Sequence, residues 1–261
     1  MTGTRLCVPE GILLLLFIGI AAPPPAHSSS SLARATSSQR TSTSTGRKPI
    51  ASTEPSHYSR GKEEVIVRDF FQDRRNGVFL DVGCWHAIQA SNTYYLEKRL
   101  GWSGIAVDAL PELAAEWKKV RPASRFYNYI VTDKDAASQT FYRAALSDIS
   151  SVKKPKTGPA GNPIAFEKIT IPAITLTDLL RKAAVTKVDY VSMDIEGAEV
   201  PALEGFDIRK FKPQLVCIEV KVQNRKKVSA YFEANGYERL RQYDRLDITN
   251  WYFASRPAGK Q

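Results

Sequence analysis

The sequence predicts an α/β protein with a mostly parallel sheet and helices on both faces. Two observations carry this prediction. Short apolar runs typical of buried strands recur along residues 58–257, and segments with the apolar spacing of amphipathic helices stand between them. Glycines follow several of these segments, at points where a turn or the end of a helix is expected. Such alternation of strands and helices is typical of a parallel sheet.

The clearest unit begins at the apolar run Val78–Val82, which predicts a buried strand closed by Gly83. A helix is expected over residues 92–100, where a glycine ends it. Residues 105–107 then predict a second buried strand, and Asp108 follows this strand directly. The unit is therefore a strand, a tight turn, a helix and a second strand that ends in an acid.

The remaining elements follow from the same patterns. A short amphipathic helix is expected before the first strand, at residues 63–72. The other predicted helices cover residues 111–120, 175–184, 196–206 and 226–235. The other predicted strands cover residues 125–132, 140–143, 169–174, 188–195, 215–220 and 250–253.

The turn after the first strand is a candidate cofactor site, because ligands of open parallel sheets bind at the carboxyl ends of the strands. Gly83 would let the backbone approach a ligand, and Asp108 could accept hydrogen bonds from ribose hydroxyls. No further glycine follows Gly83 in the turn, so the motif G-x-G-x-x-G is missing. This favours a nucleoside cofactor without a pyrophosphate, such as S-adenosylmethionine. An ordinary turn without a ligand is the alternative.

Acids also follow the later core strands. Asp194 and Glu196 close the fourth core strand and Glu219 closes the fifth, so all three should share the carboxyl edge with Asp81 and Asp108. Asp194 and Glu196 are the candidate catalytic residues, positioned to hold an acceptor hydroxyl and to accept its proton. The alternative is that Glu196 or Glu199 caps the following helix and that Glu219 pairs with a nearby base.

His86 is a further candidate base, since a histidine in the cofactor turn would titrate near neutral pH. A histidine that only makes a hydrogen bond within the turn is equally compatible with the pattern. Asp194, Glu196 and Glu219 could hold a divalent metal, because hard cations favour carboxylate oxygens. Nothing in their spacing requires one, and no metal site is predicted.

Composition limits the partners. The formal net charge is +10, but the basic residues are scattered and no nucleic-acid module accompanies them. A nucleic-acid partner is therefore not expected. The three cysteines provide neither a disulfide framework nor the spacing of a metal site.

The N-terminal part is predicted to stand apart from the folded domain. Residues 11–22 are continuously apolar, a length that suits a signal peptide better than a membrane span. Residues 1–27 are assigned to a signal peptide or a retained membrane anchor, so the domain could lie on the cytoplasmic face or be exported. Residues 28–57 form a Ser/Thr/Pro-rich linker that is too poor in apolar residues to fold. The folded domain is predicted at residues 58–257.

The segments DVGCWHAIQASNTYYLEKRLGWSGIAVDALPEL and VDYVSMDIEGAEVPALEGFD resemble the FkbM family of S-adenosylmethionine-dependent methyltransferases. The resemblance extends from about Tyr58 to Phe253. It implies a Rossmann-like class I methyltransferase fold in which Asp81, Gly83 and Asp108 face the cofactor. It also implies methyl transfer, expected to a hydroxyl of a sugar, a glycan precursor or a small metabolite.

One departure from the family keeps two alternatives open. Many members carry a second glycine where this chain has Ala87. A degenerate domain that binds a nucleoside or a partner without catalysis is therefore one alternative. An NAD-dependent oxidoreductase on the same type of sheet is the other, and the missing glycines disfavour it.

Overall fold

The computed structural model describes residues 56–144, 150–152 and 165–256. These residues belong to one compact unit. The predicted segment 1–27 lies outside them, as does the predicted linker 28–57 apart from Ser56 and His57. Within the described part of the chain, no helix is both long enough and apolar enough to cross a bilayer.

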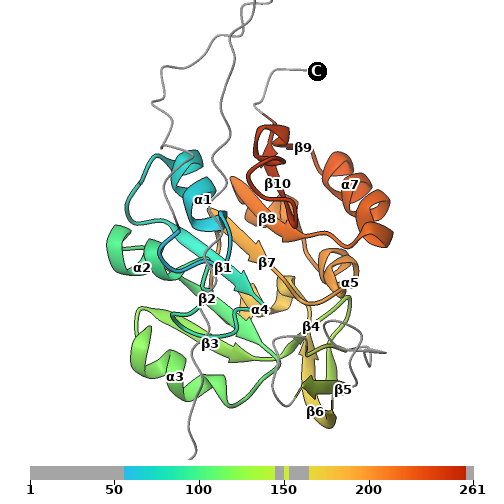
Figure 1. Ribbon diagram of the computed structural model, residues 1–261. Coiled ribbons are helices and arrows are strands. Elements are labelled where there is room, and N and C mark those ends of the chain that lie inside the picture. The colour runs from blue at the N-terminus through green and yellow to red at the C-terminus, as the bar shows by residue number, and fades with distance from the viewer. Residues whose placement is uncertain (1–55, 145–149, 153–164, 257–261) are drawn as a thin grey trace, which may run out of the picture. The chain divides into compact units, whose positions relative to one another are not determined.

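A seven-stranded sheet runs through this unit (Figure 1). Every pairing among its first five strands in space is parallel, and only β10 runs against its two neighbours. The predicted mostly parallel α/β class is confirmed. In spatial order the strands are β3 (Ser124–Asn128), β2 (Ser103–Asp108), β1 (Val78–Val82), β7 (Tyr190–Met193), β8 (Leu215–Glu219), β10 (Asn250–Ser255) and β9 (Tyr237–Arg239).

Helices cover both faces of the sheet. Successive side chains of the central strands point to opposite faces, and the apolar side chains on each face have to be covered. Leu80 of β1 packs in one core cluster and its neighbour Phe79 packs in another, and both are fully buried. The first face is covered by α4 (Leu176–Lys182), α5 (Glu199–Glu204), α6 (Ile208–Phe211) and α7 (Arg225–Ala234). The opposite face is covered by α1 (Glu63–Phe71), α2 (Tyr94–Leu100) and α3 (Leu113–Val120).

A second, three-stranded sheet corrects the prediction of one strand at 125–132. That segment divides into β3 and β4 (Ile130–Val131). The backbone N–H of Tyr129 still donates to the Asp108 carbonyl of β2, and the chain after it pairs with the second sheet. β4 pairs with β6 (Phe166–Ile174), and β6 pairs with β5 (Ala136–Ala144). The predicted strand 140–143 is the end of the longer β5.

Short elements near the end of the domain were not predicted. They are α6, β9 and the 3-10 turns η2 (Val222–Asn224) and η3 (Arg241–Tyr243). Each is too short to show a full period of apolar residues. The predicted helix 175–184 corresponds to α4, and the side chain of Thr175 caps it by accepting a hydrogen bond from the backbone N–H of Asp178.

The strand register brings the carboxyl ends of the central strands together. Asp81 of β1 lies opposite Ala106 of β2 on one side and Ser192 of β7 on the other. In the sheet, β2 and β3 lie on one side of β1, and β7 and β8 lie on the other. The direction in which successive strands are added therefore reverses at β1, and a crevice for ligands is expected at the carboxyl ends of the strands there.

Candidate functional site

Gly83 joins the turn after β1 to the end of β7. Its φ is +75°, and a Cβ placed there would lie 1.8 Å from the backbone oxygen of Asp194. Its own N–H donates to the Val107 carbonyl at 2.9 Å. The turn therefore lies directly on the end of β7, and only glycine has both the space and the backbone conformation.

Two cavities open at this edge and share three residues, Gly83, Asp194 and Glu196. The larger cavity has a volume of about 430 Å³ and is also lined by Asp81 and Glu219. The smaller has a volume of about 70 Å³, and its other lining residues include Asp108, Ile130, Val131 and Phe141. The predicted cofactor residues and the predicted acceptor residues therefore meet in one place.

Asp81 lies at the bottom of the larger cavity. It is buried, and its Oδ2 accepts a hydrogen bond from Thr93 Oγ1 at 2.6 Å. Burial raises the pKa of Asp81 to about 6, although the hydrogen bond from Thr93 and the charge of Arg121 act in the opposite direction. The carboxylate is therefore ionised at neutral pH but close to its titration range.

Asp108 organises the backbone on both sides of the smaller cavity. Its Oδ2 accepts from the backbone N–H of Trp85 at 3.0 Å, and its Oδ1 accepts from that of Leu110 at 2.9 Å. Burial raises the pKa of Asp108, while these backbone hydrogen bonds lower it. Asp108 therefore fixes the turn after β1 and also presents a carboxylate to the cavity.

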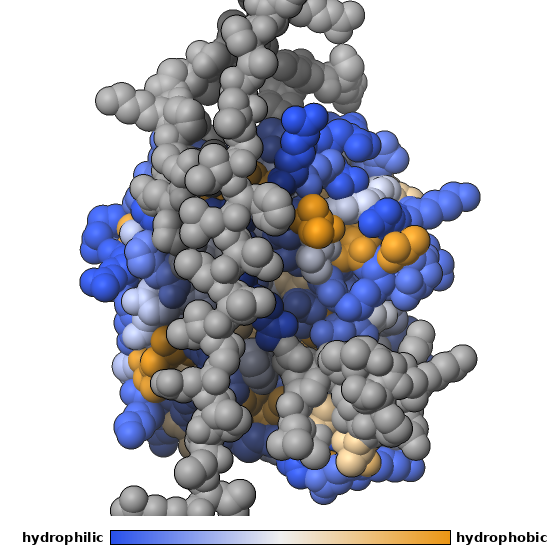
Figure 2. Space-filling view, viewed as in Figure 1, coloured by the Kyte–Doolittle hydropathy of each residue, from blue (hydrophilic) through white to orange (hydrophobic). Residues whose placement is uncertain are grey.

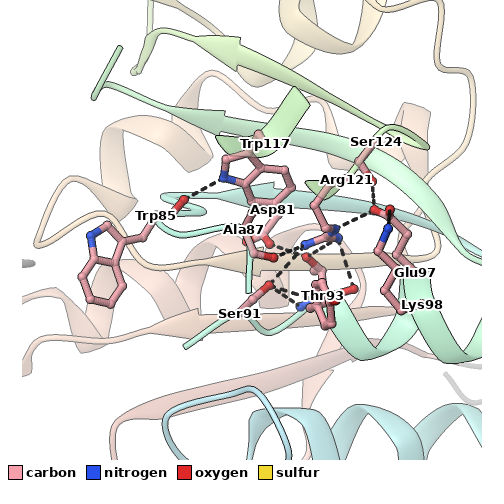
Figure 3. Close-up of polar contacts among 11 residues, drawn as sticks. Asp81, Trp85, Ala87, Ser91, Thr93, Glu97, Lys98, Trp117, Arg121 and Ser124 are labelled. Atoms are coloured by element: carbon pink, nitrogen blue, oxygen red, sulfur yellow. Dashed lines mark hydrogen bonds and ion pairs between the residues drawn. The ribbon is translucent and has the colours of Figure 1, made fainter. Parts of the chain in front are cut away.

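Arg121 donates hydrogen bonds to the residues between the end of β1 and the start of α2 (Figure 3). It follows α3 and is fully buried. Its guanidinium donates to Glu97 Oε2 at 2.6 Å and to the carbonyl of Ala87 at 3.2 Å. It also donates to Ser91 Oγ and to both oxygens of Thr93. Sequence analysis missed Arg121, because a basic residue at the end of a helix carries no signal of such contacts.

The same network accounts for Ala87, the position where many family members carry glycine. Ala87 does not adopt a left-handed backbone conformation, so its side chain causes no strain there. Its N–H donates to Glu116 Oε1 at 3.2 Å, and its side chain is buried in the cluster around Trp117. The alanine is therefore accommodated without disturbing the turn.

Asp194 and Glu196 both line the two cavities, but neither belongs to the strand that they were expected to close. β7 ends at Met193, and Glu196 lies in the following turn with a φ of +53°. Burial is the largest cause that raises the pKa of Asp194 to about 8. Asp194 is nevertheless an exposed residue, so the nearby carboxylates of Glu219, Glu196 and Glu199 account for the upward direction of its pKa better than burial does.

Of the other two acids, Glu219 matches its alternative interpretation and Glu199 does not, because the N-cap of α5 is Ala198 and no side chain caps this helix. Lys221 Nζ lies 2.7 Å from Glu219 Oε1 and 3.1 Å from Glu196 Oε2, so Glu219 is paired with a base. Burial opposes the charge of Lys221, but these contacts raise its pKa. Glu199 is fully buried and begins α5, where its Oε1 accepts from the backbone N–H of Gly197 at 3.0 Å. Burial raises the pKa of Glu199.

His86 is not brought together with the acidic residues. Its Nδ1 lies 2.9 Å from Glu116 Oε2 on α3. It lines neither the 430 Å³ cavity nor the 70 Å³ cavity. The structure therefore places this candidate base in a hydrogen bond on the far side of the turn.

Comparison with known proteins identifies the family. The family model of the methyltransferase FkbM domain matches residues 76–244, which confirms the resemblance seen in the sequence. With the order of the strands, it also confirms the expected class I methyltransferase fold. A comparison with curated proteins gives no match.

Solved structures with a similar fold share little sequence. A TehB-like SAM-dependent methyltransferase from Corynebacterium glutamicum is 16% identical with a TM-score of 0.40, over 79% of this chain and 92% of that one. Precorrin-8w decarboxylase from Methanobacterium thermoautotrophicum is 11% identical with a TM-score of 0.42, over 80% and 100%. Precorrin-6y C5,15-methyltransferase from Geobacter metallireducens is 12% identical with a TM-score of 0.39, over 73% and 84%.

Proposed function

Because the chain belongs to the methyltransferase FkbM domain family, we propose that it transfers a methyl group from S-adenosylmethionine to a hydroxyl group. The acceptor is a sugar, a glycan precursor or another small hydroxylated metabolite. One observation supports this above all: Gly83 and Asp194 line both cavities, so a donor beside Gly83 and an acceptor beside Asp194 would lie next to each other.

The residues of the two cavities fit the donor. The smaller cavity combines apolar Ile130, Val131 and Phe141 with the Asp108 carboxylate, a lining that suits an adenine ring and a ribose hydroxyl, and its volume of about 70 Å³ has to increase for a whole adenosine to enter. Each carboxylate has about four lone-pair sites, and Asp108 uses two of them for the backbone N–H groups of Trp85 and Leu110. Asp81 in the larger cavity suits the ammonium group of the methionine part. When bound, the donor supplies an electrophilic methyl group on a sulfonium.

Asp194 and Glu196 serve the acceptor side. Their carboxylates can hold an acceptor hydroxyl at the junction of the two cavities and take up its proton. In the transfer, the acceptor oxygen forms the new C–O bond, and the electron pair of the broken S–C bond goes to sulfur. The hydroxyl proton goes to a carboxylate of the site, so charge and atoms balance.

The surroundings of the larger cavity favour a polar acceptor. Residues 60–63 and 246–250 form part of its lining, and many of them are charged or carry polar groups. Figure 2 shows a mainly hydrophilic surface in this view, with hydrophobic residues in small separate areas. A polyhydroxylated molecule could exchange its hydrogen bonds with water for hydrogen bonds with these groups.

The first test is binding of the donor. Isothermal titration should show saturable binding of S-adenosylmethionine and of its demethylated product, and no binding of NAD. Binding of NAD alone would replace the proposal by an oxidoreductase. Binding of the donor without methyl uptake, in a screen of sugars and small hydroxylated metabolites with a labelled methyl group, would favour a non-catalytic domain.

Two variants then separate the roles of the two sides. Asp108→Ala should weaken donor binding by about 1–3 kcal/mol, because it removes a charged hydrogen-bond partner. Glu196→Gln should leave donor affinity near normal and lower turnover by about 10²–10⁴-fold, because it removes a group used mainly in the transition state. Normal donor affinity in a folded Asp108→Ala variant would contradict the cofactor assignment. Near-normal turnover in Glu196→Gln would contradict the acceptor assignment.

A further inference from the structure

Three carboxylates meet at the acceptor end of the site. Asp194 follows β7, Glu199 begins α5, and Glu219 ends β8. Each offers one oxygen, and the three oxygens lie within 4.8 Å of one another. Oxygens on opposite sides of a cation with bonds of about 2.1–2.4 Å lie about 4.2–4.8 Å apart, so the cluster has the size of a cation's ligand shell.

Two of these side chains keep a buried oxygen that has no hydrogen-bond partner. Glu199 is fully buried and Glu219 is 8% exposed. In each, Oε1 is occupied, by backbone N–H groups for Glu199 and by Lys221 for Glu219. In each, Oε2 is buried without a donor among the described residues. A buried carboxylate oxygen is costly unless a donor or a cation reaches it.

The three carboxylates differ in their ion pairs. Lys221 forms an ion pair with Glu219 and another with Glu196, which lies beside the cluster. Among the residues that the structure describes, no basic side chain forms an ion pair with Asp194 or Glu199. A cation bound by the cluster would therefore bring positive charge to these two carboxylates.

We propose that Asp194, Glu199 and Glu219 bind one hard divalent cation, with Mg²⁺ as the first candidate. Carboxylate oxygens are the ligands that such cations favour, and the exposed surface of Asp194 lines the cavity and provides a route for the ion. The two unpartnered oxygens would then be satisfied by the ion rather than by a protein donor.

The role of the cation rests on the proposed function. A hydroxyl of the acceptor would complete its ligand shell and be polarised there, which favours loss of the hydroxyl proton. Glu196 is not among the ligands and remains beside them as the proton acceptor. The cation would thus select acceptors that present a hydroxyl to this edge.

The test measures cation binding to the full chain in the absence of donor and acceptor. After treatment with a chelator, the protein is titrated with MgCl₂ by calorimetry and with MnCl₂ by electron paramagnetic resonance, which detects free Mn²⁺. One saturable site per chain is expected. No saturable binding of either ion up to about 10 mM, beyond the range of weak protein sites, would overturn the proposal.

Variants show whether the bound ion occupies this cluster. Glu219→Gln and Asp194→Asn should each weaken Mn²⁺ binding at least about tenfold, because even the loss of a group that only supports a ligand typically costs about 10–100-fold in affinity. Glu199→Gln tests the third ligand and keeps an oxygen that can accept from the backbone N–H groups of Ile195 and Gly197. The matched control is Glu204→Gln, an exposed position on the same helix, which should bind Mn²⁺ normally. Equal affinity in all variants would place the ion elsewhere and overturn the assignment.

The proposed function can fail independently of this site. Mn²⁺ binding that depends on Glu219, in a protein that does not bind S-adenosylmethionine, would support the cation site and reject the methyl transfer. Normal donor binding without a cation site would do the reverse.

Discussion

Gly83 connects the two halves of the site through a contact that any side chain would prevent. Its position combines two constraints, a left-handed backbone and a carbonyl oxygen where a Cβ would lie. Sequence analysis identified Gly83 from the close of an apolar run, but it could not show that the neighbour is Asp194. That neighbour is more than a hundred positions away along the chain, and only the pairing of β1 with β7 brings it there.

Gly83→Ala should lower the free energy of unfolding by about 2–4 kcal/mol, because the turn must both adopt a strained conformation and move away from β7. Donor binding should be lost with it. Gly236→Ala is the matched control, since Gly236 has a φ of +79° but a Cβ at this position would have no neighbour within 4 Å. Urea unfolding should show a loss of only about 1 kcal/mol in this control. Equal losses in the two variants would mean that the contact with Asp194 does not matter.

The raised pKa of Asp81 predicts how the free energy of unfolding depends on pH. Burial raises its pKa in the folded protein to about 6, from 3.8. Between these values the folded state binds more protons than the unfolded state, so this group stabilises the protein at low pH and the contribution is lost as pH rises through 6. The difference amounts to about 3 kcal/mol at most. Asp81→Asn should remove this part of the pH dependence, measured by urea unfolding between pH 4 and pH 7.

Protonation of Asp81 should weaken binding of the donor, although it stabilises the fold. Protonation removes the charge that Asp81 offers to an ammonium group, so affinity for S-adenosylmethionine should fall as pH drops below 6. Calorimetry of the wild type and of Asp81→Asn separates this effect from those of Arg121 and Asp108, the charged groups near Asp81. A variant that keeps the full pH dependence would show that another group is responsible.

Among the elements, the turn between β1 and α2 depends most on contacts that the sequence does not reveal. Local patterns were sufficient for the central strands β1, β2, β7 and β8 and for the longer helices, because periodicity and glycine positions are local. They were not sufficient for the position of Arg121, whose contacts reach back to Ala87 and Thr93. They also could not show that Glu199 accepts a hydrogen bond from Gly197 in the turn before α5 or that His86 turns to Glu116.

Arg121→Met should lower the free energy of unfolding by about 3–5 kcal/mol, because the buried carboxylate of Glu97 loses its closest cation and keeps only Lys98 at 3.3 Å and the Ser124 hydroxyl. The double variant Arg121→Met/Glu97→Leu should lose less, since no unpaired charge is then buried. Arg125→Met, at an exposed position of β3, is the control and should be within about 0.5 kcal/mol of wild type. A double variant no more stable than Arg121→Met would argue against the ion pair as the cause.

For the molecule as a whole, the composition of residues 1–57 predicts that the domain folds without them. A chain that begins at Ser56 should be soluble, with a melting temperature within about 2 °C of the full chain. It keeps His57 and Tyr58, whose backbone N–H groups donate to the buried carboxylate of Glu64.

A chain that begins at Gly61 is the control for this prediction. It loses the donors to Glu64, which should cost about 1–3 kcal/mol and lower the melting temperature by about 2–12 °C. A large loss already in the chain that begins at Ser56 would show that the preceding residues stabilise the domain.

The antiparallel strand β10 protects the edge of β8. It pairs with β8, whose five residues are all buried. Phe253 of β10 stacks on Phe232 of α7, with 3.8 Å between the two ring centroids. Were β10 to detach, β8 would become an apolar edge with free backbone groups, which is a template for aggregation. Changes that loosen this packing should therefore make the protein aggregate under stress, even where every group that meets the donor is intact.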